Sequence, residues 1–536
     1  MSIPRWTPSQ TLSARETKLL ARHKRSRKLF VFLRLYRHEL FDDAFQAELE
    51  SIYRSTGAGK LPCPPALLAM AMLLQGYERL SDCDAVEHTA SDARWQMVLD
   101  RMGEDEPAFA QSTLVDFRTR LISRDMDRRI LERTVELAKK TGHFDYKKLP
   151  QTLRVAVDSA PLQGAGRVED TINLMWHAAR KIVELLAALL QWDKAALCQQ
   201  AGIPLLLASS AKAALDVDWS QPQEKERALD CLIEQLESLV IWLSLHHREQ
   251  MEQQPIAYYV QTLKQVIEQD LEPDPNPTGQ GLTIREGVAK DRRISVEDAQ
   301  MRHGRKSKSQ LIDGYKRHVA EDLDTELILA CAITPANRPE REATLDLEAD
   351  LAAQNLKVAQ LQIDQAYLDS SLAESVRKAG GSVLCRPRVS HNGTLYRKQD
   401  FAVDLQAMTV TCPGGQSQPI QLGKVVHMEP SICGPCPLRS QCTDSAPNRG
   451  RSLSIALDEP RQQLLRGKVQ TPQGRAELRQ RVSVEHRLSH IVYRQGDQAR
   501  YLGLRKNLFD LRRASIIQNL ETIHRVAGPD LLRQAV

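Results

Sequence analysis

The chain has 536 residues, of which 42% are hydrophobic and 26% charged, and its formal net charge is only +5. This composition suits a globular protein of about three domains, or one enzyme core with large insertions. No apolar run approaches the ~18 residues of a membrane span, and the N-terminus lacks the apolar segment of a secretory signal. We therefore expect a cytoplasmic, nucleoid-associated protein with no membrane partner. Ten cysteines in such a chain are not expected to form a disulfide scaffold.

Positive charge is concentrated in three segments, residues 22–28, 302–308 and 475–513, whereas residues 221–274 are rich in Glu, Asp and Gln. Local basic patches on an otherwise average surface suit a polyanionic partner. For any single patch, a solvated helix face is the better explanation. Because the patches flank the acidic residues described below, we favour the polyanion.

The N-terminal part of the chain has a helical pattern, which covers residues 29–142. Within it, residues 111–121 form a short predicted helix from which Arg118 and Arg120 project. The pattern fits a helix-turn-helix-like DNA reader and also fits a plain helical bundle. We expect an all-α domain over residues 1–148 that binds DNA ends.

A mixed α/β pattern follows. A first strand ends at Asp158, and a helical block then interrupts the sheet. Two strands separated by Asp322 and Asp324 have the signature of a hairpin. Later strands alternate with helices, which is the order of a mixed α/β core. The expected strands are 152–159, 315–320, 326–334, 361–364 and 382–386, and the expected helices are 341–355 and 370–378.

The rest of the chain divides into an irregular segment and a helical one. The irregular segment is rich in Pro and Gly and holds four cysteines, and helices resume at about Thr471. The expected segments are the helical domain at 1–148, the α/β core at 149–169 and 282–386, a helical insertion at 170–281, a cysteine-bearing insertion at 387–470 and basic helices at 471–536.

Three acidic residues suggest a metal site. Asp158 and Asp364 each end a short apolar run, and Glu485 lies in a basic, helix-like stretch. Neighbouring strands can place two aspartates side by side, and a helix packed on the sheet can add the glutamate. Such carboxylates bind two magnesium ions and promote phosphodiester chemistry. Taken singly, each acid is better explained by a turn, a helix cap or a surface ion pair.

The three acids belong to a series of distinctive sequence motifs. The sequence contains Val-Asp-Ser-Ala-Pro-Leu at Asp158, Met-Arg-His-Gly-Arg-Lys at 301–306, Asp-Gly-Tyr-Lys-Arg-His-Val-Ala at 313–320, Ile-Asp-Gln-Ala-Tyr at 363–367 and Tyr-Leu-Gly-Leu-Arg-Lys-Asn at 501–507. From about residue 30 to 525 this series resembles the DDE transposases of bacterial insertion sequences. It is similar to the branch with an N-terminal helical domain and a cysteine-bearing insertion before the glutamate.

The resemblance implies a ribonuclease H-like core with Asp158, Asp364 and Glu485 as the catalytic triad. It implies two Mg ions, for which Mn can substitute, and an enzyme that cuts double-stranded DNA at terminal repeats and joins the 3′ hydroxyls to target DNA. It also implies a homo-oligomer on DNA. No Gly-rich nucleotide loop is present, so ATP use is not expected.

The sequence has only some of the residues that the family carries around the catalytic glutamate. Arg481 matches the arginine ahead of the glutamate, but Leu478 and Val492 stand where many relatives have tyrosine and lysine. Arg494 lies nearby and is a candidate substitute for that lysine. The departure concerns how the DNA end is held and leaves the metal chemistry unaffected.

Basic residues near these motifs are candidates for phosphate contact, with solvated loops as the alternative. They are Arg302, Arg305, Lys306, Lys316, Arg481, Arg494, Arg505 and Lys506.

Four cysteines form a second candidate metal site. Cys412 is followed by Cys433, Cys436 and Cys442, and a Cys-x-x-Cys pair with two further thiols is compatible with structural zinc. An iron–sulfur cluster and a set of unliganded thiols remain open. The segment has too few apolar residues to fold on its own core, which favours a metal.

Three functions fit these observations. The first is a metal-dependent DDE transposase. The second is a non-catalytic DNA-binding protein that uses its cysteine module for recognition. The third is a ribonuclease H-like nuclease that cuts DNA without joining strands.

Overall fold

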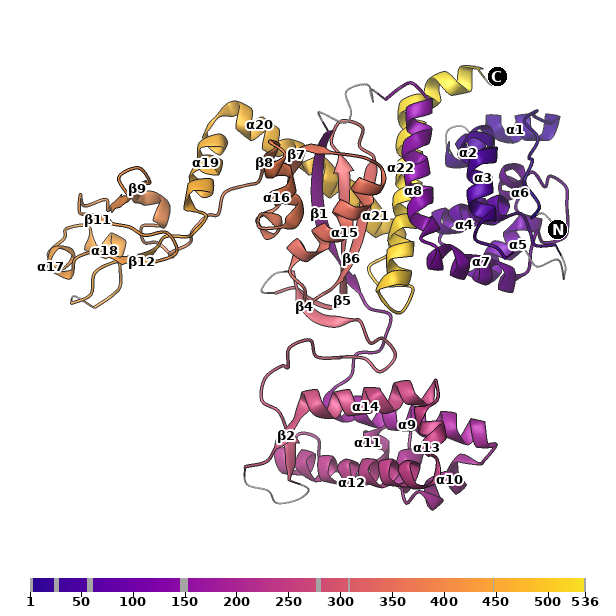
Figure 1. Ribbon diagram of the computed structural model, residues 1–536, viewed down its shortest axis with the longest axis horizontal. Helices are drawn as coiled ribbons and strands as arrows, with labels where there is room; N and C mark the ends of the chain where they lie inside the picture. The colour runs from indigo at the N-terminus through magenta and orange to yellow at the C-terminus, as the bar shows by residue number, and fades with distance from the viewer. Residues whose placement is uncertain are drawn as a thin grey trace.

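The computed structural model describes residues 3–23, 28–54, 61–144, 153–275, 281–306, 309–446 and 448–534. It has a mixed α/β core with N-terminal helices on one side, a helical bundle below and a cysteine-bearing module on the other side (Figure 1). In these ranges, no helix has the length and apolar character needed to cross a membrane.

The N-terminal helices pack around α4, whose residues from Pro65 to Gly76 are all buried. Pro65 occupies the first turn of α4, where its missing N–H costs nothing, and Arg79 ends the helix in the left-handed conformation. These helices are α1 (Ala14–His23), α2 (Lys28–Leu40), α3 (Asp43–Glu50), α4 (Pro65–Glu78), α5 (Asp82–Ser91), α6 (Ala93–Leu99), α7 (Gln111–Ser123) and α8 (Met126–Lys140).

The predicted projection of two arginines from α7 is wrong for Arg118. That side chain is 8% exposed and forms an ion pair with Asp82 on α5. Arg120 packs its guanidinium over the ring of Tyr53. Arg118 therefore holds the N-terminal helices together instead of facing solvent.

The central sheet has the order β4-β5-β1-β7-β8, and β6 pairs with β5. The predicted hairpin is confirmed as β5 and β6, which are antiparallel. β1 is antiparallel to β5 and parallel to β7, and β8 continues in parallel. The strands are β1 (Leu153–Gln163), β4 (Arg302–Arg305), β5 (Leu311–Asp322), β6 (Ile328–Pro335), β7 (Val358–Gln362) and β8 (Ser382–Leu384), and the helices between them are α15 (Thr344–Ala353) and α16 (Ser371–Lys378).

Two C-terminal helices complete the core, α21 (Val482–Gln495) and α22 (Leu504–Gln534). α22 lies between the sheet and the N-terminal helices, with α8 alongside it (Figure 1). Asn519 of α22 donates to the Ile328 carbonyl of β6 and to Thr134 Oγ1 of α8, both at 2.9 Å. The N-terminal helices and the sheet consequently share one continuous hydrophobic core.

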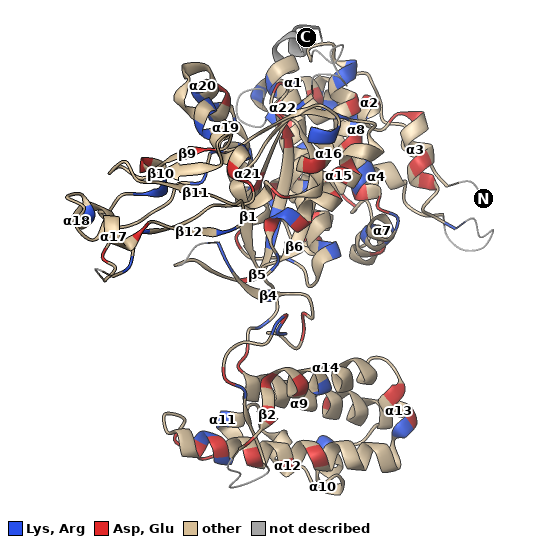
Figure 2. Ribbon diagram, turned by 60° about the vertical axis from the view of Figure 1, so that its left-hand side comes forward, with Lys and Arg blue, Asp and Glu red and all other residues tan. Residues whose placement is uncertain are grey.

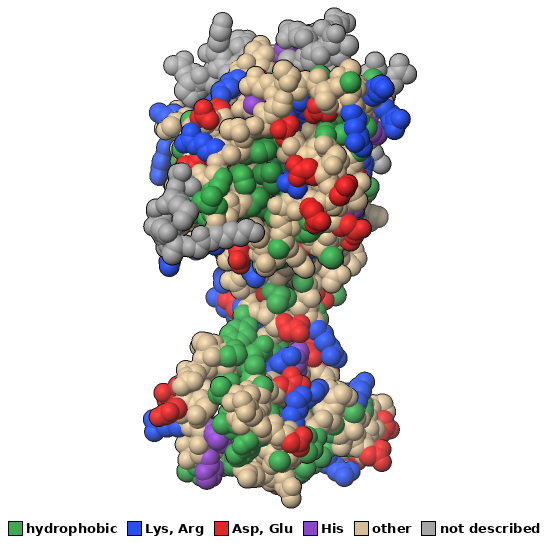
Figure 3. Space-filling model, turned by 90° about the vertical axis from the view of Figure 1, so that its right-hand side faces the viewer, with side chains coloured by type: hydrophobic (Ala, Val, Ile, Leu, Met, Phe, Trp, Pro, Cys, Tyr) green, Lys and Arg blue, Asp and Glu red, His purple; other side chains and the backbone are tan. Residues whose placement is uncertain are grey.

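The helical insertion between β1 and β4 has a hydrophobic core of its own. In two views it forms a separate body joined to the sheet through a narrow connection (Figures 1 and 2). The space-filling view shows the same narrowing between the two bodies (Figure 3). Its elements are α9 (Thr171–Leu190), α10 (Lys194–Gln200), α11 (Ala211–Ala214), α12 (Pro222–His246), α13 (Arg248–Glu252), α14 (Ile256–Asp270), β2 (Leu271–Pro273) and β3 (Leu282–Ile284).

The cysteine-bearing module has short strands, two one-turn helices and a small apolar cluster. It connects back to the sheet through α19 (Glu459–Gln470) and α20 (Pro472–Gln480). Helical structure therefore resumes at Glu459, twelve residues earlier than the expected Thr471. The other elements are β9 (Ala402–Asp404), β10 (Thr409–Thr411), β11 (Ser417–Pro419), β12 (Val425–His427), β13 (Ser452–Ser454), α17 (Pro430–Cys433) and α18 (Arg439–Cys442).

Candidate active site

Parallel pairing places the two candidate aspartates at the same level of the sheet. Ala156 of β1 pairs with Gln362, the last residue of β7, and Asp158 and Asp364 each lie two residues further on. Asp158 therefore lies within β1, and Asp364 lies at the corresponding level just beyond the end of the adjacent strand β7. One expectation is corrected, since Asp158 lies inside β1 and not at its end. β1 continues to Gln163 by pairing with β5, and Gln163 also forms an isolated bridge with Gln498.

Glu485 comes from α21, which packs against β1. Val484, Leu488 and Ile491 are buried at helical spacing and hold one face of α21 on the core. Glu485 lies beside this face and is half-exposed. It opens into the same cavity as the two aspartates, a volume of about 740 Å³. The cavity is lined by Asp158, Ser159, Ala160, Lys306, Glu340, Asp364, Gln365, Ala366, Arg481, Glu485, Leu488, Ser489 and Val492.

A single guanidinium joins the three acids. Nη2 of Arg481 lies 2.9 Å from Oδ1 of Asp158, and Nη1 lies 2.9 Å from Oδ1 of Asp364 and 3.1 Å from Oε1 of Glu485. With the guanidinium between them, the three carboxylates do not all bring an oxygen within 4.8 Å of the other two, as judged over the described residues. The acids thus converge on one positive charge.

The three carboxylates differ in their access to solvent. The Asp158 side chain is 15% exposed, whereas those of Asp364 and Glu485 are 52% and 50% exposed. Burial raises the pKa of Asp158, Arg481 opposes this shift, and the neighbouring charge of Asp364 adds to it. A cation in the cavity would therefore stabilise the ionised form of Asp158 most.

A neutral hydrogen-bonded network supports the turn that carries Asp364. Tyr367 in this turn has its hydroxyl 2.7 Å from Nδ1 of His318, and Nε2 of His318 is 2.9 Å from Oγ1 of Thr334. Burial lowers the pKa of His318 to about 3 and raises that of Tyr367 well above its usual value, so both stay uncharged. Both residues belong to motifs noted in the sequence, but their pairing required the fold.

Sequence reasoning also missed two other acids near the site. Glu340 lines the cavity from the short 3₁₀ helix Glu340–Ala343, which precedes α15. Glu321 of β5 is fully buried beneath α21, where Ser483 donates to its Oε1 at 3.2 Å and Arg487 lies beside it. No local signal distinguished Glu321, because its burial depends on a helix about 160 residues away in the sequence.

Two of the eight basic candidates line the cavity, Arg481 and Lys306. Nζ of Lys306 donates to the Ser159 carbonyl at 3.1 Å, which places its ammonium beside Asp158. Lys506 is exposed at the start of α22, and Arg305 ends β4.

The other four candidates are tied to protein partners. Arg302 donates to the carbonyls of Ala299 and Met301, and Lys316 is 9% exposed and donates to the Arg338 carbonyl. Arg494 pairs with Glu521, and Arg505 pairs with Asp125 and Asp127. Their role in DNA binding stays a prediction.

The four clustered cysteines line a second, much smaller cavity of about 20 Å³. All ten cysteines of the chain are free thiols. The backbone N–H of Gln416 donates to Cys412 Sγ at 3.3 Å, and a Cβ at Gly414 would lie 3.2 Å from Cys436 Sγ. A space of this size holds about one water-sized body. No three of the four sulfur atoms, all in the described chain, lie within 4.8 Å of one another, so the loops would have to close on an ion.

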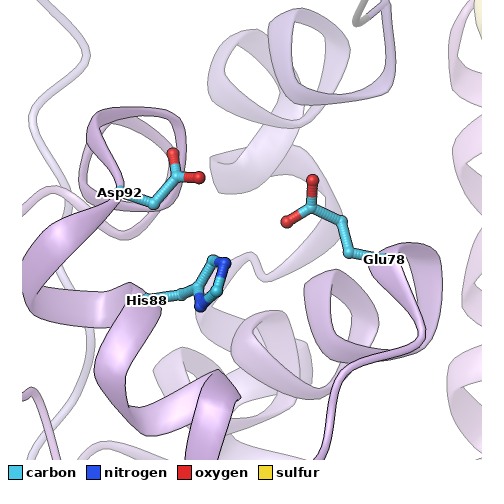
Figure 4. Close-up of side chains that lie close together, drawn as sticks. All are labelled: Glu78, His88 and Asp92. Atoms are coloured by element: carbon cyan, nitrogen blue, oxygen red, sulfur yellow. The ribbon is translucent and has the colours of Figure 1, made fainter.

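Another group of potential metal ligands lies in the N-terminal helices. Glu78, His88 and Asp92 bring ligand atoms within 4.8 Å of one another (Figure 4). Arg94 already pairs with Glu78 at 2.9 Å and with Asp92, and Trp95 donates to Glu78 at 2.8 Å. These contacts compensate part of the negative charge of the two carboxylates and contribute to the packing of α4 against α5 and α6.

The triad cavity fits divalent metal better than this group does. Its donors are three carboxylates from three separate elements, and hard oxygen donors are those that magnesium prefers. Arg481 lies among the three acids, which shows that the cavity accommodates a positive charge where they converge. The donor set is thus suited to the metal that the fold and sequence imply.

Comparison with protein families now adds independent evidence. Residues 411–524 match a model described as Transposase DDE domain, and residues 21–120 match one described as Transposase domain (DUF772). Searches of curated proteins and of solved structures found no match. Together with the α/β core and its acidic cavity, these matches indicate a protein of DNA transposition. The two matches, which together cover less than half of the chain, indicate an insertion-sequence DDE transposase. Enzymes of this family act on DNA and generally use divalent metal ions.

Proposed function

We propose that the chain cleaves double-stranded DNA at the terminal repeats of an insertion sequence and transfers the 3′ ends to target DNA. We propose further that Asp158, Asp364 and Glu485 are its catalytic residues, in a ribonuclease H-like core. The mixed sheet, in which an antiparallel hairpin adjoins β1 on one side and parallel strands adjoin it on the other, supports this fold.

The observation that carries the proposal is the convergence of three acids from distant parts of the sequence. Asp158 comes from β1, Asp364 follows β7, and Glu485 comes from α21. Each carboxylate reaches the same guanidinium within 3.1 Å. A protein that only binds DNA gains nothing by bringing three carboxylates together in one cavity.

The acidic and the basic residues of the cavity have different roles in the proposed reaction. The three acids would hold two Mg or Mn ions, which activate the attacking water or hydroxyl and stabilise the leaving oxygen. Lys306 and Arg481 offer positive charge to the phosphate and so position it. Lys506 offers a further contact outside the cavity, and an oligomer on DNA would bring two element ends together.

The test is a cleavage and joining assay with Mg²⁺ and DNA that carries the element's terminal repeats. Asp364→Ala should abolish both reactions while folding and DNA binding persist, because Asp364 is half-exposed. Glu374→Ala, which removes an exposed carboxylate of α16, is the matched control and should keep both activities. Residual chemistry in Asp364→Ala would place the metal site elsewhere.

The same assay separates the alternative functions. Binding of the terminal repeats without cleaved or joined products would indicate a non-catalytic DNA-binding protein. Cleavage without joining would indicate a nuclease.

We also propose a structural zinc ion held by Cys412, Cys433, Cys436 and Cys442. The shared cavity supports the proposal, since four free thiols border a space for one small ion. The module's own apolar core is small, so metal binding would supply folding energy. Elemental analysis of fresh, reduced protein should find one zinc per chain.

Cysteine variants test the same proposal. Cys436→Ser should lose the zinc, whereas Cys83→Ser, an exposed cysteine of α5, should keep it. Stoichiometric iron with visible absorbance would indicate an iron–sulfur cluster instead. Absence of both metals would show that the thiols are unliganded.

A further inference from the structure

Arg481 occupies the point at which the three acids of the cavity converge. Its Nη1 and Nη2 make all three ion pairs, and its side chain is only 13% exposed. A guanidinium does not lose its proton under physiological conditions, so this charge is permanent. Three carboxylates gathered without a cation would repel one another. Arg481 therefore supplies charge compensation that a divalent ion would otherwise supply.

The guanidinium and a shared metal ion cannot both lie among these carboxylates. With Arg481 in place, the acids do not present three oxygens within 4.8 Å of one another anywhere among the described residues. A metal bound to all three needs oxygens close enough to share one coordination sphere. The side chain must therefore leave before all three acids bind a common ion.

The position of Arg481 in the backbone favours such a movement. It is at once the C-terminal cap of α20 and the N-terminal cap of α21, so the two helices meet at this one residue. Its Nε is buried and has no hydrogen-bond partner among the described residues, so only the two terminal nitrogens hold it in place. Most of α20 is exposed.

We infer that Arg481 is a resident counter-cation that competes with divalent metal for Asp158, Asp364 and Glu485. Metal binding expels the guanidinium from among the acids and frees it to bind a DNA phosphate. The inference rests on the proposed metal site of the triad. According to this inference, Arg481 stabilises the fold of the metal-free enzyme and keeps its affinity for divalent metal low.

The test is calorimetric titration of the DNA-free, full-length protein with Mn²⁺. Arg481→Gln should bind Mn²⁺ about tenfold more tightly than the wild type, because the competing charge is gone. Arg479→Gln removes the same charge from an exposed position of α20 and should bind like the wild type. Equal or weaker Mn²⁺ binding by Arg481→Gln would overturn the inference.

A third variant separates this inference from the proposed function. If Asp364→Asn binds Mn²⁺ as well as the wild type does, the triad is not the metal site and both ideas fail. If Asp364→Asn loses the ion while Arg481→Gln does not gain affinity, only the inference fails.

A second measurement uses the wild type alone, in case Arg481→Gln does not fold. Mn²⁺ should increase amide hydrogen exchange around residues 478–484, where α20 meets α21, because the side chain that ties this joint to the sheet is released. Unchanged or slower exchange there at saturating Mn²⁺ would also overturn the inference.

Discussion

Asp158 and Arg481 are 323 positions apart in the chain, yet Nη2 of Arg481 donates to Oδ1 of Asp158 at 2.9 Å. The contact forms because α21 packs its buried face on β1, which brings the start of the helix over the middle of the strand. The chain between the two residues contains the other five strands of the sheet and two large insertions. The long helical insertion and the cysteine module both leave and rejoin the core without disturbing this contact.

A first prediction concerns the buried charges that attach α22 to the rest of the core. Arg512 pairs with Asp125, Asp127 and Asp350, and its side chain is 5% exposed. Arg512→Ala should lower the free energy of unfolding by about 3–5 kcal/mol, because it leaves the buried carboxylate of Asp350 without its ion pair and removes one of the two arginines that pair with buried Asp127. Urea unfolding followed by circular dichroism measures the change.

The control for this prediction is Arg128→Ala. Arg128 is 34% exposed and pairs with Asp125 and Glu132 near the surface, so its loss should cost less than about 1 kcal/mol. Equal effects of the two variants would show that burial of the Arg512 network does not contribute to stability.

Part of this architecture could be predicted from local patterns. An apolar run that ends in an acid marked the sites of Asp158 and Asp364, and two strand-like runs separated by Asp322 and Asp324 marked the β5–β6 hairpin. These features depend on residues close in sequence, so the sequence expresses them directly. The end of β1 could not be predicted from the local sequence in the same way. Pro161 argues against a longer strand, but the antiparallel partner β5 carries β1 on to Gln163.

The basic residues show why the remainder could not be predicted. A run of arginines near the C-terminus suggests a surface for DNA, but Arg505 pairs with Asp127, 378 residues away. Arg118 pairs with Asp82 in the same manner, inside the N-terminal helices. The amino-acid composition gives the number of charged residues but not their partners. Which of these side chains are buried depends on how the helices pack, as α22 does against α8. The burial of Glu321 beneath α21 could not be predicted for the same reason.

A second prediction concerns the close approach of the β4 edge to the loop after β6. A Cβ at Gly304 would lie 2.1 Å from the carbonyl oxygen of Ala336, which no side chain tolerates. Gly304→Ala should therefore push β4 away from β5 and displace Lys306 from the cavity, with weaker DNA cleavage and faster hydrogen exchange at residues 302–306. Gly467→Ala, where a Cβ meets nothing within 4 Å, should leave both unchanged.

A third prediction concerns pH. Burial raises the pKa of Glu321 from 4.5 to about 8, although Arg487 opposes the shift. Between these two values the folded protein keeps a proton that the unfolded chain has lost. The free energy of unfolding should therefore fall as the pH rises through this window. Glu321→Gln should remove up to about 1.4 kcal/mol per pH unit of that slope.

Unfolding by urea at several pH values measures this slope. Glu374→Gln is the control, because its exposed carboxyl pairs with Lys378 and that contact lowers its pKa below the window. An equal slope in the wild type and Glu321→Gln would mean that the buried acid is ionised throughout.

The last prediction concerns the cation beside Asp158. Nζ of Lys306 donates to the Ser159 carbonyl, and the side chain lines the cavity. A phosphate in the cavity would lie within reach of this ammonium, so Lys306→Ala should make the slope of log affinity against log salt shallower by about 0.9. Lys378→Ala removes an exposed lysine of α16 outside the cavity and should keep the wild-type slope. If Lys306→Ala also keeps the slope while cleavage is lost, the ammonium acts on the acids and not on the DNA backbone.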